Sequence, residues 1–180
     1  MATALMAFDG TAAQETAEGG AGASRVLVVY FSCTGTTRRV AEAVAETLGA
    51  TLYRITPAET YTAADLNWND AASRSSVEMK DPSSRPALSG NKIDAQAYDT
   101  VLLGYPIWWD EAPRAVNTFI ESQNLQGGVQ VIPFATSGGS SIDGSVRALR
   151  ATYPALNWQK GRLLNGGAKA AASWARSLGL

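Results

Sequence analysis

A short run of small polar side chains is the first part of the sequence whose residue types could hold a ligand. The run Ser32-Cys-Thr-Gly-Thr-Thr37 lies between an apolar segment and a segment with helical periodicity. The first turn of a helix leaves backbone N–H groups unpaired and carries partial positive charge, so this loop is suited to a phosphate dianion. Gly35 would let the backbone approach the anion closely. The alternative is that Thr36 or Thr37 only caps the helix.

Two further loops carry residues that are unusual at the end of a strand. Pro106-Ile-Trp-Trp109 places two large aromatic side chains after an apolar run, where exposed aromatics are expected to cover something flat. Adjacent residues of an extended loop point in opposite directions, so we expect one tryptophan to pack inward and the other to face a ligand. Core packing of the tryptophans is the alternative. The second loop, Thr136-Ser-Gly-Gly-Ser140, again consists of small residues.

Segments typical of strands and helices alternate along the chain and would position these loops. Continuous apolar or β-branched runs predict strands over residues 26–31, 100–105 and 129–135, and alternating side-chain types predict a short strand over residues 51–55. A weak fifth strand is predicted around 156–158 and 162–164. Apolar residues at helical spacing predict helices over residues 40–48, 113–122, 142–153 and 168–178. This alternation predicts an α/β fold with a doubly wound, five-stranded parallel sheet in the order 2-1-3-4-5 and helices on both faces. In that order the three loops meet in one crevice at the carboxyl ends of the strands.

Taken together, the three loops resemble those of the flavodoxin-like, FMN-binding family. The run Ser32 to Thr37 is similar to the flavodoxin phosphate loop, S/T-x-T-G-x-T, and the other two loops are similar to those that flank the flavin. The resemblance covers about residues 25–180. It implies a flavodoxin-like fold, FMN as the cofactor, and electron transfer through the bound flavin, either as a carrier or as an oxidoreductase. The partner would be a redox protein or a small-molecule electron acceptor.

The resemblance also implies which residues bind the cofactor. The 5′-phosphate would be held by the first loop, the isoalloxazine flanked by the second, and the ring edge or ribityl chain contacted by the third: Ser32, Cys33, Thr34, Gly35, Thr36 and Thr37; Pro106, Ile107, Trp108 and Trp109; Thr136, Ser137, Gly138, Gly139 and Ser140. No residue is assigned a catalytic role.

Two features of the sequence differ from those of a dedicated electron carrier. Such flavodoxins are typically strongly acidic, whereas this chain has a formal net charge of −1. A polar insertion over residues 58–92, with a helix predicted at about 63–80, is longer than a minimal carrier needs. Both features favour an oxidoreductase or a carrier with a less electrostatic partner. Residues 1–24 read as a flexible extension before the flavodoxin-like domain of residues 25–180, without the pattern of an intact signal peptide.

Two other functions remain open from the sequence. Cys33 and Arg39 have the C-x5-R spacing with which low-molecular-weight tyrosine phosphatases and arsenate reductases attack a bound oxyanion. That alternative leaves the tryptophan pair and the third loop unexplained. The second alternative is a flavin-free binding module, since fold does not fix function.

Composition excludes several classes of function. The chain has no histidine and a single cysteine, so we expect no Ser-His-Asp triad, disulfide framework or metal site. The near-balanced charge predicts no nucleic-acid partner. No apolar run approaches the length of a membrane span, which favours a cytoplasmic location. The sequence does not indicate an oligomeric state.

Overall fold

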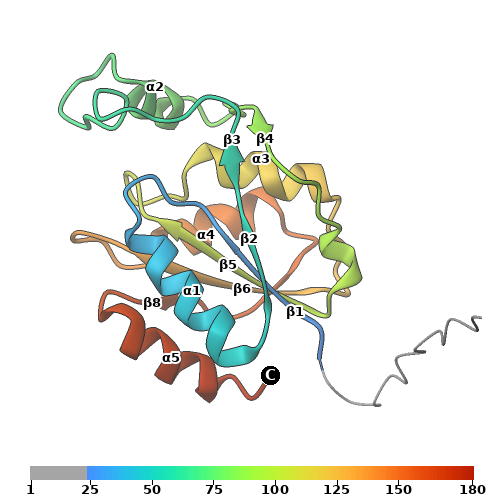
Figure 1. Cartoon of the computed structure of the whole chain (residues 1–180). Coiled ribbons are helices and arrows are strands. Elements are labelled where there is room, and N and C mark those ends of the chain that lie inside the picture. Colours follow the sequence, from blue (N-terminus) through green and yellow to red (C-terminus); the bar gives the residue numbers. More distant parts are fainter. Residues whose placement is uncertain (1–23) are drawn as a thin grey trace, which may run out of the picture.

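A parallel sheet forms the centre of the computed structural model, which describes residues 24–180 (Figure 1). Its strands lie in the order β2-β1-β5-β6-β7, and β8 pairs with β6 further along the same edge. The strands are β1 Val26–Tyr30, β2 Thr51–Arg54, β5 Thr100–Pro106, β6 Gln130–Thr136, β7 Asn157–Trp158 and β8 Arg162–Leu163. All pairings in this sheet are parallel. With β7 and β8 together forming the fifth strand, the predicted fold class and order are confirmed.

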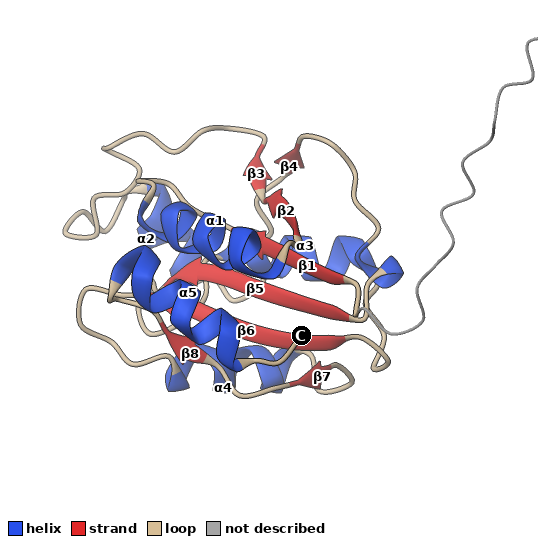
Figure 2. Cartoon of the chain, turned by 60° about the horizontal axis from the view of Figure 1, so that its bottom comes forward, coloured by secondary structure: helices blue, strands red, loops and turns tan. Residues whose placement is uncertain are grey.

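Two pairs of helices cover the two faces of this sheet (Figure 2). On one face α1 (Thr36–Leu48) packs beside α5 (Gly167–Ser177), and on the other lie α3 (Arg114–Gln123) and α4 (Asp143–Thr152). A short 3-10 helix, η1 (Ala95–Ala97), precedes β5. These four helices agree with their predicted ranges, apart from a few residues at the ends. Between residues 24 and 180, no helix is both long enough and apolar enough to cross a membrane.

The central strands divide their side chains between two apolar cores. In β1, for example, Leu27 packs with residues of α3 and α4, whereas Val28 packs with residues of α1 and α5. Both faces are buried, which is why these strands read as continuous apolar runs in the sequence. Gly104 in β5 allows the ring of Phe134 to lie against the strand, since a Cβ atom at position 104 would fall 2.3 Å from that ring.

The fifth strand is interrupted by a bulge. β7 pairs with the beginning of β6, where Asn157 faces Gln130, and β8 pairs with its end, where Arg162 faces Phe134. The edge therefore contains one more residue between these two points than β6 does. An extra residue of this kind breaks the ladder locally. This irregularity explains why the sequence pattern of the fifth strand is weak.

The insertion between β2 and β5 differs from its prediction. A helix was predicted over about 63–80, but α2 covers only Arg74–Lys80, and residues 63–73 form successive turns. The N–H and the hydroxyl of Thr62 both donate to the carboxylate of Asp65, at 2.8 and 2.9 Å. Short polar side chains that bind nearby backbone groups compete with helix formation. The longer helix prediction is therefore wrong.

A two-stranded antiparallel ribbon lies at the base of the insertion, where it leaves the domain (Figure 1). It consists of β3 (Thr56–Pro57) and β4 (Leu88–Ser89), which the sequence did not predict. β2 ends at Arg54, one residue before the predicted end of the second strand, and Pro57 pairs with Leu88 in the ribbon. The ribbon brings the two ends of the insertion together, so the segment between them projects from the domain as a unit.

Candidate functional site

Residues 32–37 form the turn that joins β1 to α1. Gly35 precedes the helix with φ 92° and ψ −4°, a left-handed conformation that favours glycine. Its N–H donates to the hydroxyl of Ser32 at 3.1 Å, which closes the turn. No side chain caps α1, so the alternative that Thr36 or Thr37 serves as the cap is wrong. The N–H groups of the first helical turn are therefore available to an anion.

Thr136 joins all three of the unusual loops. Its hydroxyl lies 2.8 Å from the hydroxyl of Thr37, and both side chains are buried. Its carbonyl accepts a hydrogen bond of 2.9 Å from the N–H of Ile107. Thr34 and Thr36, by contrast, are exposed in the first loop. The buried threonines thus fix the loops relative to one another, while the exposed ones face the space between them.

The tryptophan pair belongs to a tight turn after β5. The backbones of Trp108 and Glu111 hydrogen-bond to each other in both directions, at 2.9 and 3.0 Å. The two residues between them, Trp109 and Asp110, have φ of 47° and 60°. Left-handed backbone at both central positions defines a type I′ turn, which usually contains asparagine and glycine. A tryptophan in this conformation is strained.

The two tryptophans have different environments. Trp108 packs edge-on against Phe31 and Tyr61, with ring centroids 5.6 Å apart in each case. It therefore packs inward, as one member of the pair was predicted to do. Trp109 is 49% exposed, although it lines a cavity described below.

Both acidic side chains of this turn are engaged by neighbours. Asp110 accepts a hydrogen bond from the hydroxyl of Ser140, which links the turn to the third loop. Glu111 forms an ion pair with Arg114 at 2.6 Å. The carboxylate of Glu111 is consequently neutralised by the first residue of α3.

The third loop is held by its own side chains and by the edge strand. The hydroxyl of Ser137 accepts from the N–H groups of Gly139 and Ser140, at 3.2 and 2.8 Å. Asn165, which follows β8, accepts from the N–H of Ser137 at 2.9 Å and donates to its carbonyl at 2.8 Å. This two-bond clamp fixes the loop to the fifth strand.

The three loops line a crevice at the carboxyl edge of the sheet. Its larger part is a cavity of about 610 Å³. The residues that line it come from the three loops and from the segment after β8: Thr34, Thr36, Arg39, Val40, Pro106, Ile107, Trp108, Thr136, Ser137, Gly138, Leu164, Asn165, Gly167 and Ala168. The N-terminal ends of α1 and α5 both contribute, and each carries partial positive charge.

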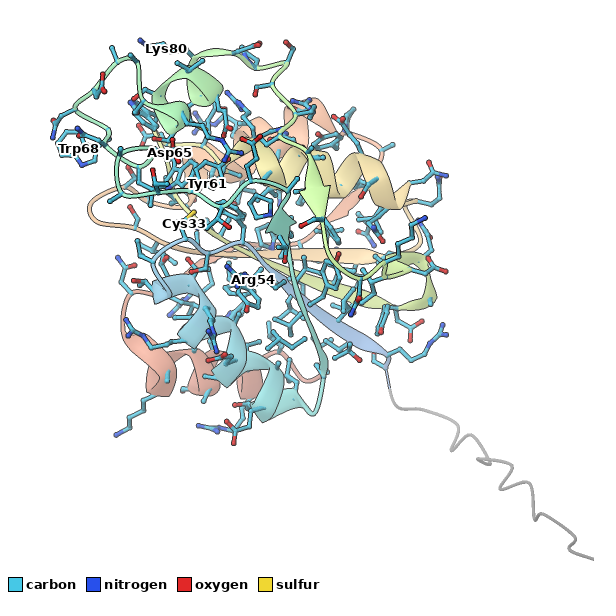
Figure 3. The ribbon with its side chains drawn as sticks, turned by 45° about the horizontal axis from the view of Figure 1, so that its top comes forward. Cys33, Arg54, Tyr61, Asp65, Trp68 and Lys80 are labelled. Atoms are coloured by element: carbon cyan, nitrogen blue, oxygen red, sulfur yellow. The ribbon has the colours of Figure 1, made fainter. Side chains whose placement is uncertain are left out.

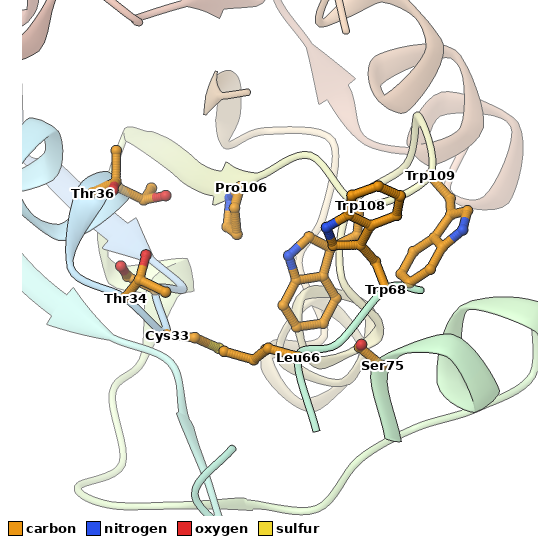
Figure 4. A pocket seen from close by; sticks show the side chains of 11 residues that line it. Cys33, Thr34, Thr36, Leu66, Trp68, Ser75, Pro106, Trp108 and Trp109 are labelled. Carbon is orange, nitrogen blue, oxygen red and sulfur yellow. The ribbon is translucent and has the colours of Figure 1, made fainter. Parts of the chain in front are cut away.

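A smaller cavity of about 210 Å³ adjoins the larger one and extends under the insertion. Thr34, Thr36, Pro106 and Trp108 line both cavities, so the two form one continuous crevice. The remaining lining residues are Ser32, Cys33, Thr37, Leu66, Trp68, Ser75 and Trp109. In Figure 4 the three tryptophans lie together on one side of this cavity, with Thr34 and Thr36 across from them. The insertion thus covers one end of the crevice.

Arg114 attaches the insertion to the domain. This buried side chain donates to the carbonyl oxygens of Met79 (2.9 Å) and Glu78 (3.4 Å), at the end of α2. Inside the insertion, the guanidinium of Arg74 lies 3.9 Å from the ring centroid of Tyr61 and pairs with Glu78 at 2.7 Å. The hydroxyl of Tyr61 also donates to Glu78. Burial, together with this hydrogen bond, raises the pKa of Tyr61, which stays protonated as a donor.

Cys33 does not have the environment of a nucleophilic thiol. Burial raises its pKa to about 12, although Arg54 and Arg74 act in the opposite direction. A catalytic cysteine needs a lowered pKa so that the thiolate is present at neutral pH. Cys33 lines the smaller part of the crevice, under the insertion, whereas Arg39 lines the larger part. The structure therefore argues against the C-x5-R phosphatase or reductase. Figure 3 shows Cys33 beneath Tyr61 of the insertion.

Most of the residues predicted from the sequence line this crevice. Those that do not are Gly35, Gly139 and Ser140, which shape the loops instead. The sequence did not predict the other lining residues, which are Leu66, Trp68 and Ser75 in the insertion, Arg39 and Val40 in α1, and Leu164, Asn165, Gly167 and Ala168 after β8. Asn165 could have been found, because it follows the fifth strand at the same edge of the sheet.

The fold and the crevice define a doubly wound α/β protein with an uncapped helix N-terminus beside its topological switch point. A family model described as Flavodoxin matches residues 25–177, and the chain belongs to the flavodoxin family. The comparison with curated proteins returned no match.

Solved structures that resemble the chain include two from Bacteroides species, both described as flavoproteins. The one from Bacteroides eggerthii is 54% identical, with a TM-score of 0.80, over 87% of this chain and 99% of the other. The one from Bacteroides uniformis is 53% identical, with a TM-score of 0.81, over 86% and 99%. A flavoprotein from Lactobacillus acidophilus, solved in complex with FMN, is 22% identical, with a TM-score of 0.67, over 78% and 93%, and shares the fold.

Proposed function

We propose that the chain binds FMN in the crevice between residues 32–37, 106–109 and 136–140, and exchanges electrons through the bound flavin. The observation that carries this proposal is the meeting of the three loops around Thr136 at the carboxyl edge of the sheet. Membership of the flavodoxin family supports it. So does the FMN complex of the Lactobacillus acidophilus flavoprotein, which has the same fold.

The crevice fits each part of FMN. The uncapped N-terminus of α1, with the exposed hydroxyls of Thr34 and Thr36, would hold the phosphate. The tryptophan turn and the loop around Ser137 would lie on either side of the flat ring system. The walls of the larger cavity combine apolar surface with fixed polar groups, as the walls of cofactor sites commonly do.

Each part of the chain would have a separate task in the complex. Bound FMN supplies the redox chemistry. Thr37 and Thr136 keep the phosphate loop at a fixed distance from the third loop, because their hydroxyls bond to each other. Leu66 and Trp68 of the insertion would exclude water from one end of the crevice.

The net charge of the chain and the insertion over the crevice both bear on the choice between a carrier and an oxidoreductase. A net charge of −1 gives little electrostatic steering toward a basic protein partner. The insertion restricts access to the crevice on the side of Trp108. Both features support an oxidoreductase that reacts with a small-molecule acceptor. The domain boundary near residue 25 and the cytoplasmic location stay predictions.

Titration of the purified protein with FMN tests the proposal. Saturation at one FMN per chain, with the flavin fluorescence quenched on binding, would support it. Replacing Thr34 and Thr36 together by valine should weaken FMN more than riboflavin, which lacks the phosphate. Anaerobic reductive titration then separates uptake of one electron from uptake of two. Equal loss of affinity for both flavins would contradict the assigned phosphate loop.

A further inference from the structure

A third cavity lies on the outer side of the tryptophan turn. Its volume is about 290 Å³, and it is formed by the insertion on one side and the turn on the other. Trp68 and Trp109 line both this cavity and the smaller cavity at the covered end of the crevice. This volume is close to the lower end of the range for small-molecule sites. The cavity is therefore large enough for a compound with a single ring or two fused rings.

The walls of this cavity expose two large aromatic surfaces. Trp68 is 72% exposed and Trp109 is 49% exposed, which is unusual for two tryptophans that share one cavity. Met79, only 9% exposed, adds a flexible apolar surface. Indole rings favour flat aromatic partners, because offset and edge-on contacts between rings are attractive beyond the area they bury.

The charges around the cavity favour an anion. Lys80, the last residue of α2, lines the cavity and forms no ion pair with any residue from 24 to 180. Its ammonium group makes one long contact, 3.5 Å, to the carbonyl of Ala71. The acidic residue in the wall, Glu111, is paired with Arg114 at 2.6 Å. Figure 3 shows Trp68 and Lys80 at the outer edge of the insertion.

We propose that Trp68, Trp109, Met79 and Lys80 form a second binding site, which takes a flat aromatic carboxylate. The rings would pack against the tryptophans, and the carboxylate would pair with the ammonium of Lys80. The site adjoins the candidate flavin crevice, since both tryptophans line the two cavities. If this ligand also accepts electrons from the flavin, that role rests on the proposed function. The binding of the ligand does not depend on the proposed function.

Isothermal titration of the full chain with 2-naphthoate and 2-naphthamide tests the proposal. The two probes share their rings and differ in charge. We expect 2-naphthoate to bind at least about tenfold more tightly than the amide, as a charge-assisted contact would require. Lys80→Gln should abolish this preference, and Trp68→Leu should weaken both probes. Lys92→Gln, which removes an exposed lysine outside the cavity, is the matched control.

The outcomes distinguish this site from the flavin site. Titrations are made with and without saturating FMN, and circular dichroism verifies that each variant is folded. Lys80→Gln should bind FMN like the wild type, because Lys80 does not line the crevice. Equal affinity for the two probes, an unchanged preference in Lys80→Gln, or displacement of naphthoate by FMN would overturn the proposal. Naphthoate binding without any FMN binding would uphold it and contradict the proposed function.

Discussion

The hydroxyl groups of Thr37 and Thr136 lie 2.8 Å apart although 99 positions separate them in the sequence. Both side chains are buried, at 1% and 5% exposure, so each hydroxyl has little contact with bulk water. This single hydrogen bond connects the start of α1 with the end of β6. It fixes the distance between two of the three loops before any ligand binds.

Replacing Thr37 by valine should leave the hydroxyl of Thr136 buried without its partner. We expect a loss of about 1–3 kcal/mol in the free energy of unfolding, measured by urea denaturation. The double variant Thr37→Val, Thr136→Val should lose less than the sum of the two single changes, because no orphaned hydroxyl remains. Additive losses would show that the two hydroxyls do not interact.

Replacing Arg114 by methionine should release the insertion from the domain. The carbonyl oxygens of Glu78 and Met79 would lose their buried donor, with an expected cost of about 1–3 kcal/mol. Hydrogen exchange should accelerate within α2 and much less in β5. Arg147→Met, on the exposed side of α4, is the control. Unchanged exchange in α2 would mean that other contacts hold the insertion.

Replacing Gly104 by alanine should force a methyl group against the ring of Phe134, at 2.3 Å. Overpacking of this kind typically costs about 1–3 kcal/mol, which thermal denaturation would detect. Gly128→Ala is the control, because nothing lies within 4 Å of a Cβ atom there. Adding Phe134→Leu to Gly104→Ala should recover part of the loss, and the absence of any recovery would contradict the assigned clash.

Cys33 should react slowly with iodoacetamide at neutral pH, since burial raises the pKa of its thiol from 9.0 to about 12. The folded protein keeps a proton that the unfolded chain loses between these values. The stability from Cys33 is therefore complete below about pH 9 and is lost as the pH rises toward 12. Cys33→Ala should remove this contribution to the pH dependence of unfolding. Rapid alkylation of the native protein at pH 7 would contradict the shift.

The sheet and its crevice were predictable because each depends on local sequence patterns. Strands covered on both faces are continuous apolar runs, as in β1 and β5, and parallel strands place their following loops at one edge. The order of the strands was predicted together with the alternation of strands and helices along the chain. The inward packing of one tryptophan of the pair could be anticipated, but not which one. The left-handed turn could not be anticipated either, since Trp109 is a poor residue for such a turn.

The insertion was the least predictable part of the fold. Its apolar residues Leu66, Trp68, Val77 and Met79 suggested one long helix, yet local side-chain bonds such as Thr62 to Asp65 favour turns. Its place over the crevice depends on Arg114, whose partners within the insertion are backbone carbonyls, and a contact with a backbone carbonyl cannot be predicted from residue types. Long-range contacts of this kind decide where Trp68 lies.

The broken fifth strand has a consequence for how molecules of this protein meet one another. An uninterrupted outer strand would offer a row of free N–H and C=O groups to a neighbouring chain, and such rows promote aggregation. Here the bulge between β7 and β8 splits that row into two pieces of two residues each. The opposite border, β2, has only four residues. Neither edge of the sheet therefore offers a long row of free backbone groups. This should help the protein to resist intermolecular strand addition at high concentration.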